Sequence, residues 1–327
     1  MPSSQPSYPT PLTIPPLQPP HKQTLILLHG RGSNASLFSH QLLTTPFPIT
    51  TTTTSTLTNT PDPITTLRTA FPHAKFVFPT ASRRRTAQFN RSLINQWFDC
   101  WTPYEIPIQR EELQIEGLRE SVAFIHEVVR AEVEGVEGGA GRVIVGGLSQ
   151  GCATGLVAGL LWEGEALGGW VGFCGRLPFG RGVGGVLGNG NGNGGEEDGD
   201  GDEIEGEGEG GNPFAVEDDD EGVRGDDTPL PARAVNYLRE ELGIPASRPL
   251  STTTDDSLLF QKTPVFLGHG TADDKVPICL GQEAARCLKE MGMDVTWHEY
   301  QGLGHWYSET MLGDFVKFVR EKVDWEV

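Results

Sequence analysis

Six short apolar runs recur along the chain, and Gly, Pro or polar residues bound each of them. The runs are continuously apolar rather than alternating, which is typical of strands that a parallel sheet buries on both faces. The predicted strands are Thr24–Leu28, Lys75–Phe78, Arg142–Val145, Trp170–Phe173, Pro264–Leu267 and Val295–Tyr300.

Helical patterns lie between these strands. From Glu111 to Val133 the apolar residues recur at steps of three and four, which places them on one face of a helix. A similar pattern covers Met311 to Val319 near the C-terminus. Strands that alternate with helices predict one α/β domain with a mostly parallel central sheet and helices on both faces.

Three segments do not follow this alternation. Residues 1–21 are rich in Pro and predict a flexible leader before a single domain over 22–327. Residues 44–66 are rich in Thr and predict a long surface loop. Residues 180–228 are rich in Gly and then in Asp and Glu, so they offer too little apolar area to offset the entropy of ordering. We therefore expect a disordered acidic insertion there.

The acidic insertion also accounts for most of the net charge. Sixteen acidic residues lie between Glu196 and Asp227, against a single base, Arg224, while the formal charge of the whole chain is −19. The remaining chain is only mildly acidic. Neither a nucleic-acid partner nor an anionic membrane surface is indicated.

The cysteines and the apolar runs bear on the compartment. The five cysteines are odd in number and scattered, with no C-x-x-C pair that would suggest zinc or redox chemistry. The N-terminus lacks the basic and apolar regions of a secretory signal, and no apolar run approaches the roughly 20 residues of a membrane span. These features predict a cytoplasmic protein without an integral membrane segment.

A nucleophile motif stands at residues 147–151, Gly-Leu-Ser-Gln-Gly, which matches G-x-S-x-G. The predicted strand before it and the helix-compatible, small-residue segment after it form the strand–turn–helix context that this motif requires. Ser149 is therefore the candidate nucleophile.

A serine hydroxyl needs a base to take its proton and a carboxylate to orient that base. His305 lies in a Gly-rich turn directly after the last predicted strand. For the acid, Asp273 and Asp274 follow the preceding strand, and the spacing leaves both possible. The order Ser, Asp, His along the chain is that of α/β-hydrolases. Two backbone N–H donors are also needed for the oxyanion, and we expect them at Gln150 and at Arg31.

The order of these motifs resembles that of the acyl-protein thioesterase and carboxylesterase family, also called the phospholipase/carboxylesterase family of α/β-hydrolases, and suggests a fungal-type carboxylesterase-like member. The resemblance covers about residues 22–179 and 229–325. It rests on Leu-Leu-His-Gly-Arg-Gly-Ser at 27–33, Phe-Pro-His-Ala-Lys-Phe-Val-Phe-Pro at 71–79, Gln-Trp-Phe-Asp at 96–99, the serine motif, Leu-Pro at 177–178, His-Gly-Thr-Ala-Asp-Asp-Lys-Val-Pro at 269–277 and Gly-Leu-Gly-His at 302–305.

The resemblance implies roles for particular residues. The fifth position of the family's His-Gly pattern falls on Asp273, and the oxyanion donor falls on Arg31. Trp97 and Leu177 are implied near the acyl-binding cleft and its lid. Arg176 stands where the family usually has Trp, and Arg31 where it usually has Leu, which places two cations near the cleft.

The sequence thus predicts a serine hydrolase of the α/β-hydrolase fold that cleaves esters or thioesters through an acyl-enzyme on Ser149. The expected substrate is a small acyl ester or an acylated protein, with no cofactor and no metal; the sequence does not indicate an oligomeric state. Two alternatives are an interaction module with a vestigial hydrolase body, and a peptidase or polysaccharide deacylase on the same fold.

Overall fold

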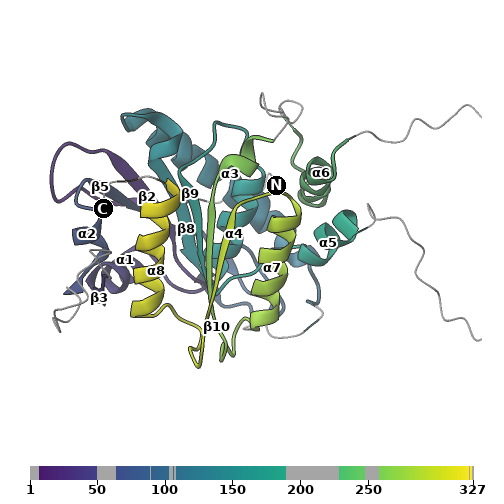
Figure 1. Ribbon diagram of the computed structural model, residues 1–327. Helices are drawn as coiled ribbons and strands as arrows, with labels where there is room; N and C mark the ends of the chain where they lie inside the picture. Colours follow the sequence, from purple (N-terminus) through teal and green to yellow (C-terminus); the bar gives the residue numbers. More distant parts are fainter. Residues whose placement is uncertain are drawn as a thin grey trace, which may run out of the picture.

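A seven-stranded sheet forms the centre of the molecule (Figure 1). The computed structural model describes residues 7–49, 64–88, 90–102, 106, 108–188, 228–246, 258–323 and 325. Six strands run parallel, and β1 pairs antiparallel with β5 at one edge. The strand order is β1 (Leu12–Ile14), β5 (Ala74–Phe78), β2 (Gln23–Leu28), β8 (Val143–Leu148), β9 (Gly169–Phe173), β10 (Val265–Gly270) and β11 (Val295–Tyr300).

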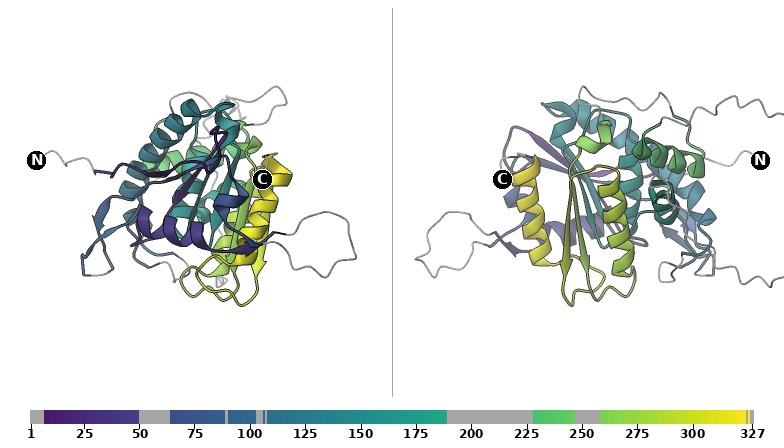
Figure 2. Two further views of the ribbon diagram at one scale, coloured as in Figure 1. Left: turned by 90° about the vertical axis from the view of Figure 1, so that its left-hand side faces the viewer. Right: turned by 45° about the vertical axis from the view of Figure 1, so that its right-hand side comes forward.

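Helices cover both faces of this sheet, as the two views of Figure 2 show. The apolar side chains of β2 alternate between the faces: Ile26 and Leu28 belong to one core cluster, and Leu25 and Leu27 to the other. The first cluster packs against α3 (Glu112–Gly135), α4 (Gln150–Leu160), α5 (Gly180–Gly188), α6 (Leu230–Leu242) and α7 (Ile278–Glu290). The second packs against α1 (Ala35–Thr44), α2 (Leu67–Ala70) and α8 (Glu309–Phe318). The predicted α/β architecture, a mostly parallel sheet with helices on both faces, is confirmed. No described helix is long and apolar enough to cross a membrane.

The register of the parallel strands brings four loops to one edge of the sheet. Leu28 pairs with Gly147, and Gly147 pairs with Gly172. Further along the sheet, β9 pairs with β10, and β10 pairs with β11. Because all these strands are parallel, the loops after β2, β8, β10 and β11 emerge together at their carboxyl ends, where ligands bind in α/β sheets.

The prediction of a flexible leader over residues 1–21 needs correction. Within it, β1 pairs with β5, and Tyr8 stacks on Phe124 of α3 with ring centroids 4.1 Å apart. The strand itself contains no proline, since Pro11 and Pro15 lie on either side of Leu12–Ile14, so the Pro-rich composition did not prevent pairing. Residues 1–6 lie outside the described part.

Two further segments differ at their ends from the sequence-based predictions. In the expected loop over 44–66, β3 (Phe47–Pro48) pairs antiparallel with β4 (Ile64–Thr65), and residues 50–63 lie outside the described part. In the expected insertion over 180–228, residues 180–188 form α5, because Val183 and Leu187 are buried in the core next to α6 and α7. Residues 189–227 lie outside the described part.

Candidate active site

Ser149 occupies the sharp turn between β8 and α4. Its backbone has φ 57° and ψ −118°, a conformation that non-glycine residues rarely adopt and that typically costs 1–3 kcal/mol. The turn also needs close backbone contacts, since a Cβ on Gly151 would lie 2.3 Å from the carbonyl oxygen of Leu28. Both glycines of the motif are therefore required sterically, and the strained turn directs the Ser149 hydroxyl out of the sheet.

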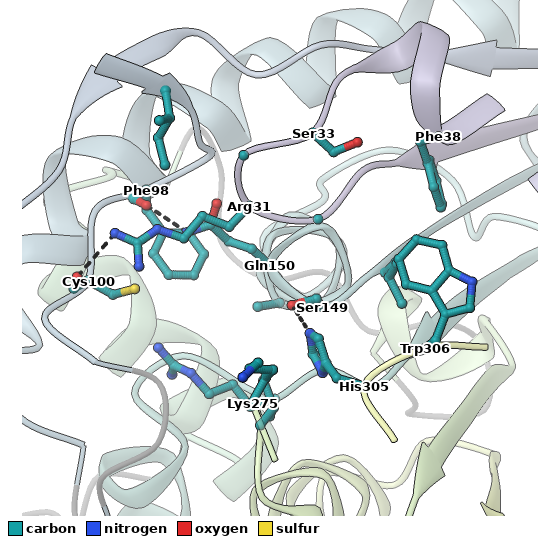
Figure 3. Close-up of a pocket in the computed structure, with 18 of the residues that line it drawn as sticks. Arg31, Ser33, Phe38, Phe98, Cys100, Ser149, Gln150, Lys275, His305 and Trp306 are labelled. Atoms are coloured by element: carbon teal, nitrogen blue, oxygen red, sulfur yellow. Dashed lines mark hydrogen bonds between the residues drawn. The ribbon is translucent and has the colours of Figure 1, made fainter. Parts of the chain in front are cut away.

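A continuous hydrogen-bond chain joins three side chains from three loops. The Ser149 hydroxyl donates to Nε2 of His305 at 2.8 Å (Figure 3). Nδ1–H of His305 donates to Oδ2 of Asp273 at 2.7 Å. The side chain of Asp273 is 0% exposed, while that of His305 is 20% exposed and faces a cavity. This is the geometry of a nucleophile, a base and an orienting acid.

Three hydrogen bonds and a close contact with His269 hold Asp273. Its Oδ1 accepts the backbone N–H groups of Lys275 and Val276, each at 2.8 Å, and its Oδ2 also lies 3.2 Å from Nε2 of His269. Burial opposes ionisation, but these hydrogen bonds and the one from His305 outweigh it and lower the pKa of Asp273 well below its usual range. Asp274 is 71% exposed and pairs with Lys275. The geometry therefore separates the two acids that the spacing could not.

The two expected oxyanion donors, Arg31 and Gln150, both line the cavity beside Ser149. The side chain of Gln150 is locked: it accepts from the backbone N–H of Trp97 at 2.9 Å and donates to the carbonyl oxygen of Phe98 at 2.7 Å. The side chain of Arg31 turns away from Ser149 and pairs with Asp99 at 3.4 Å.

His29 fixes the loop that carries Arg31. It is fully buried; its Nδ1–H donates to the carbonyl oxygen of Gly30 at 2.7 Å, and its Nε2 accepts from the N–H of Ala81 at 3.0 Å. This pairing requires the neutral ring, and burial lowers the pKa of His29 to about 4. His29 is thus a positioning residue.

We predict an acid-sensitive stability from His29. An unfolded histidine titrates near pH 6.5 and the folded one near 4, so the unfolded state binds the proton first and stability falls as the pH drops through this window. The expected loss is about 2 kcal/mol at pH 5. The melting temperature of His29→Gln should depend less on pH between 7 and 5 than that of the wild type, whereas the surface variant His73→Gln should behave as the wild type. Equal pH dependence in all three proteins would contradict this role.

Trp97 does not contact the cavity, which corrects the predicted role near the acyl group. It is 0% exposed, and its indole Nε1–H donates to the carbonyl oxygen of His29 at 2.8 Å. Together with Gln150 it ties the loop after β2 to the start of α4. Trp97 therefore holds these two segments in place and does not line the cavity beside Ser149.

A cavity of about 580 Å³ opens above Ser149, and we call it the serine cavity. Its walls are mostly apolar. In Figure 3, Phe38 and Trp306 lie on one side of Ser149 and His305, while Phe98 and Cys100 lie on the other. Leu177 is not among its lining residues; it is 3% exposed and lines a second cavity of about 400 Å³. The predicted contact of Leu177 with substrate in the serine cavity is therefore corrected.

Cys174, Asp273 and His305 form a group whose ligand atoms lie within 4.8 Å of one another. Burial raises the pKa of Cys174 to about 12, so its thiol resists becoming the thiolate that a metal would need. Asp273 and His305 are already hydrogen-bonded in the chain to Ser149. This group is better suited to proton transfer than to metal binding.

Sequence reasoning missed two contributors. His269 was visible only as part of the His-Gly pattern, although its ring approaches the same carboxylate oxygen as His305. The side chain of Gln150 was also missed, because its role depends on residues 97–98, about fifty positions away. The only sequence signal for His269 is the His-Gly pattern at 269–277, and the only one for Gln150 is the serine motif at 147–151.

Comparisons with known proteins agree with this geometry. The family profile described as phospholipase/carboxylesterase matches residues 60–184 and 243–323. Acyl-protein thioesterase 1 of Yarrowia lipolytica is 24% identical over 254 residues, which cover 77% of this chain and 79% of that protein. Acyl-protein thioesterase 1 of Schizosaccharomyces pombe is 28% identical over 159 residues, or 48% of this chain and 58% of that protein. The crystal structure of Zea mays acyl-protein thioesterase 2 aligns with a TM-score of 0.59 at 20% identity, over 97% of this chain and 100% of that one, and so shares the fold.

Proposed function

Because the chain belongs to the phospholipase/carboxylesterase family, we propose that Ser149, His305 and Asp273 are the catalytic triad of this serine hydrolase. Members of this family cleave carboxylic ester or thioester bonds. The observation that carries the proposal is the unbroken hydrogen-bond chain, 2.8 Å and 2.7 Å long in its two links, at the floor of the serine cavity.

In the first half of the reaction, the Ser149 oxygen attacks the acyl carbonyl carbon while His305 Nε2 takes the hydroxyl proton. The carbonyl π electrons move onto oxygen and form a tetrahedral oxyanion. When the oxyanion collapses, the bond to the leaving oxygen or sulfur breaks, and the leaving group takes the proton from His305. The acyl group is then esterified to Ser149.

In the second half, water replaces the leaving group. His305 takes a proton from water as its oxygen attacks the acyl-enzyme, and returns that proton to Ser149 as the acid departs. Asp273 remains ionised throughout and stabilises the imidazolium. The backbone N–H groups of Arg31 and Gln150 serve as the oxyanion donors in both halves.

The serine cavity favours an apolar acyl group. Phe38, Phe98, Leu148, Ala153 and Trp306 line it, and a volume of about 580 Å³ lies within the range of small-molecule sites. The names of the relatives, acyl-protein thioesterases, suggest acylated proteins as substrates, and we include both these and small acyl esters in the proposal. We also propose a cytoplasmic location, in keeping with five free cysteines.

Trp306 is expected to select for longer acyl chains. It is 40% exposed and lines the serine cavity, so Trp306→Ala removes apolar wall without opening the core. We expect kcat/KM for an octanoyl ester to fall roughly tenfold while an acetyl ester changes little. Trp101 is 38% exposed and does not line the serine cavity, so Trp101→Ala is the matched control. Equal losses on both esters, or in both variants, would contradict the assignment.

The proposal is tested by three octanoyl compounds: a 4-nitrophenyl ester, an alkyl thioester and a 4-nitroanilide. We expect the purified full chain to turn over the ester and the thioester, and the anilide far more slowly or not at all. Faster cleavage of the anilide would favour the peptidase alternative. Absence of turnover on all three would contradict the proposed function.

A further inference from the structure

One charged side chain in the wall of the serine cavity has no part in the triad. Arg176 is 6% exposed and lines both the serine cavity and the second cavity. Its segment packs directly on the nucleophile turn, since a Cβ on the preceding Gly175 would lie 3.2 Å from the carbonyl oxygen of Ser149. The backbone at Arg176 therefore lies beside the nucleophile turn, and its side chain forms part of the wall of the serine cavity.

Arg176 forms no ion pair with an acidic side chain among the described residues. Its Nη2 donates to Oε1 of Gln114 at 2.7 Å, and the guanidinium carbon lies 5.9 Å from the ring centroid of Phe98. The other two cations of the serine cavity are paired: Arg31 lies 3.4 Å from Asp99, and Lys275 lies 3.0 Å from Asp274. Arg176 differs from both, because its contacts are an uncharged amide and an aromatic face.

Two acidic residues act on Arg176 only through space. Glu111 and Glu283 line the second cavity but not the serine cavity, and neither forms an ion pair with Arg176. Burial lowers the pKa of the Arg176 guanidinium, yet arginine keeps its proton in proteins. Burying a cation without an acidic residue in direct contact is costly, and such groups are concentrated at functional sites.

We propose that Arg176 binds an anionic group of the ester substrate, so that the preferred substrates carry a carboxylate or phosphate as well as the scissile bond. This inference rests on the proposed function of the same site. A guanidinium presents donors in a planar fork that matches two oxygens of a carboxylate or phosphate. Gln114 accepts from one of the two N–H donors of Nη2, so the second Nη2 donor can still pair with Nε–H or with Nη1–H as a two-donor fork for the anion.

The apolar and cationic parts of the serine cavity then have different tasks. The wall with Phe38 and Trp306 contacts the apolar portion of the substrate, and Arg176 contacts its anion near Phe98. An uncharged ester fills the same cavity but forms no ion pair with Arg176. The selectivity then arises from the difference between the binding free energies of the anionic and the uncharged ester.

The test compares matched esters that differ only in the anion. Monomethyl adipate against methyl hexanoate places a carboxylate on the acyl side, and butyrylglycerol phosphate against butyrylglycerol places a phosphate on the alcohol side. The wild type should show a kcat/KM at least tenfold higher for the anionic member of one pair, and that pair identifies the side on which the anion lies.

Variants connect this preference to Arg176. Arg176→Gln should remove the preference by lowering kcat/KM for the anionic ester tenfold or more, with the neutral ester changed little, and that neutral turnover reports that the variant is folded. Arg176→Lys keeps the charge without the fork and should retain part of the preference. Arg130→Gln, an exposed residue of α3 that does not line the serine cavity, removes one positive charge and should retain all of it.

The outcomes distinguish this inference from the proposed function. Equal turnover of anionic and neutral esters by the wild type would overturn the anion site while leaving the hydrolase intact. A preference that Arg176→Gln and Arg176→Lys both keep would overturn the role of Arg176. Failure of the wild type on every ester would overturn the proposed function and this inference with it.

Discussion

Ser149→Ala is expected to lower kcat for ester hydrolysis by about 10⁵-fold. The variant keeps the serine cavity but has no atom that can form the acyl-enzyme, and His305 loses the donor at 2.8 Å from its Nε2. The residual rate would come from the oxyanion donors and from substrate binding alone. The measurement is single-substrate kinetics on a 4-nitrophenyl ester with enzyme of verified folding.

The matched control is Ser36→Ala, which removes a hydroxyl from an exposed position on α1. It should keep the kcat of the wild type. If Ser149→Ala kept kcat within tenfold of the wild type, Ser149 would not be the nucleophile, and the hydrogen-bond chain would have another role.

Asp273→Asn is expected to lower kcat by about 10⁴-fold. The carboxylate accepts at both oxygens: Oδ1 from the N–H groups of Lys275 and Val276, and Oδ2 from His305. An amide has one acceptor oxygen, so its NH₂ group must face one of these donors. If the NH₂ group faces His305, the imidazole is forced into the tautomer that cannot accept the proton of Ser149.

Asp274→Asn is the control for this second prediction, because it makes the same change one residue away. Asp274 is 71% exposed, and within the described part of the chain its side chain forms an ion pair with Lys275. Its kcat should stay within about twofold of the wild type, as is usual for an exposed ion pair. A larger loss of kcat in Asp274→Asn than in Asp273→Asn would show that Asp273 is not the orienting acid.

The sheet and the sharp turn that carries Ser149 were predictable from the sequence because both depend on local patterns. Buried parallel strands are continuously apolar, so the run at Trp170–Phe173 was located within one residue of β9. The limits of Val295–Tyr300 were also correct, although this strand lies at the edge of the sheet and is only partly buried. The G-x-S-x-G motif carries its own steric requirement, which the structure shows at Gly151. Local pattern was sufficient wherever the constraint lay within a few residues.

Asp273 and Asp274 could not be separated by spacing, because both lie in the loop after β10. The difference arises from the local turn, in which the backbone N–H groups of Lys275 and Val276 point to Oδ1 of Asp273 and bury it. The family resemblance chose Asp273 from position alone. The physical reason for it appears only in three dimensions.

The boundaries of the leader and the insertion were wrong for a related reason. β1 pairs with β5 some sixty residues later, and α5 is helical because Val183 and Leu187 pack on distant helices. Neither contact leaves a signal in the Pro-rich or Gly-rich segment itself. Composition describes how costly ordering is, but not which distant surface offsets that cost.

Arg31 and Arg176 also looked equivalent in the sequence, as two cations near the cleft. The structure separates them by their partners: Asp99 pairs with Arg31, whereas Arg176 contacts Gln114 and the face of Phe98. Which arginine is paired depends on long-range contacts, so its consequence for substrate choice could not be predicted from composition.

Labelling with a fluorophosphonate, followed by mass spectrometry of the peptides, tests the central claim most directly, because this reagent reacts with a serine only when a base activates it. We expect one adduct, on Ser149, that Ser149→Ala abolishes and that Asp273→Asn slows strongly while Asp274→Asn leaves its rate unchanged. An adduct on a different residue, or a wild-type protein that reacts no faster than Ser149→Ala, would contradict the account.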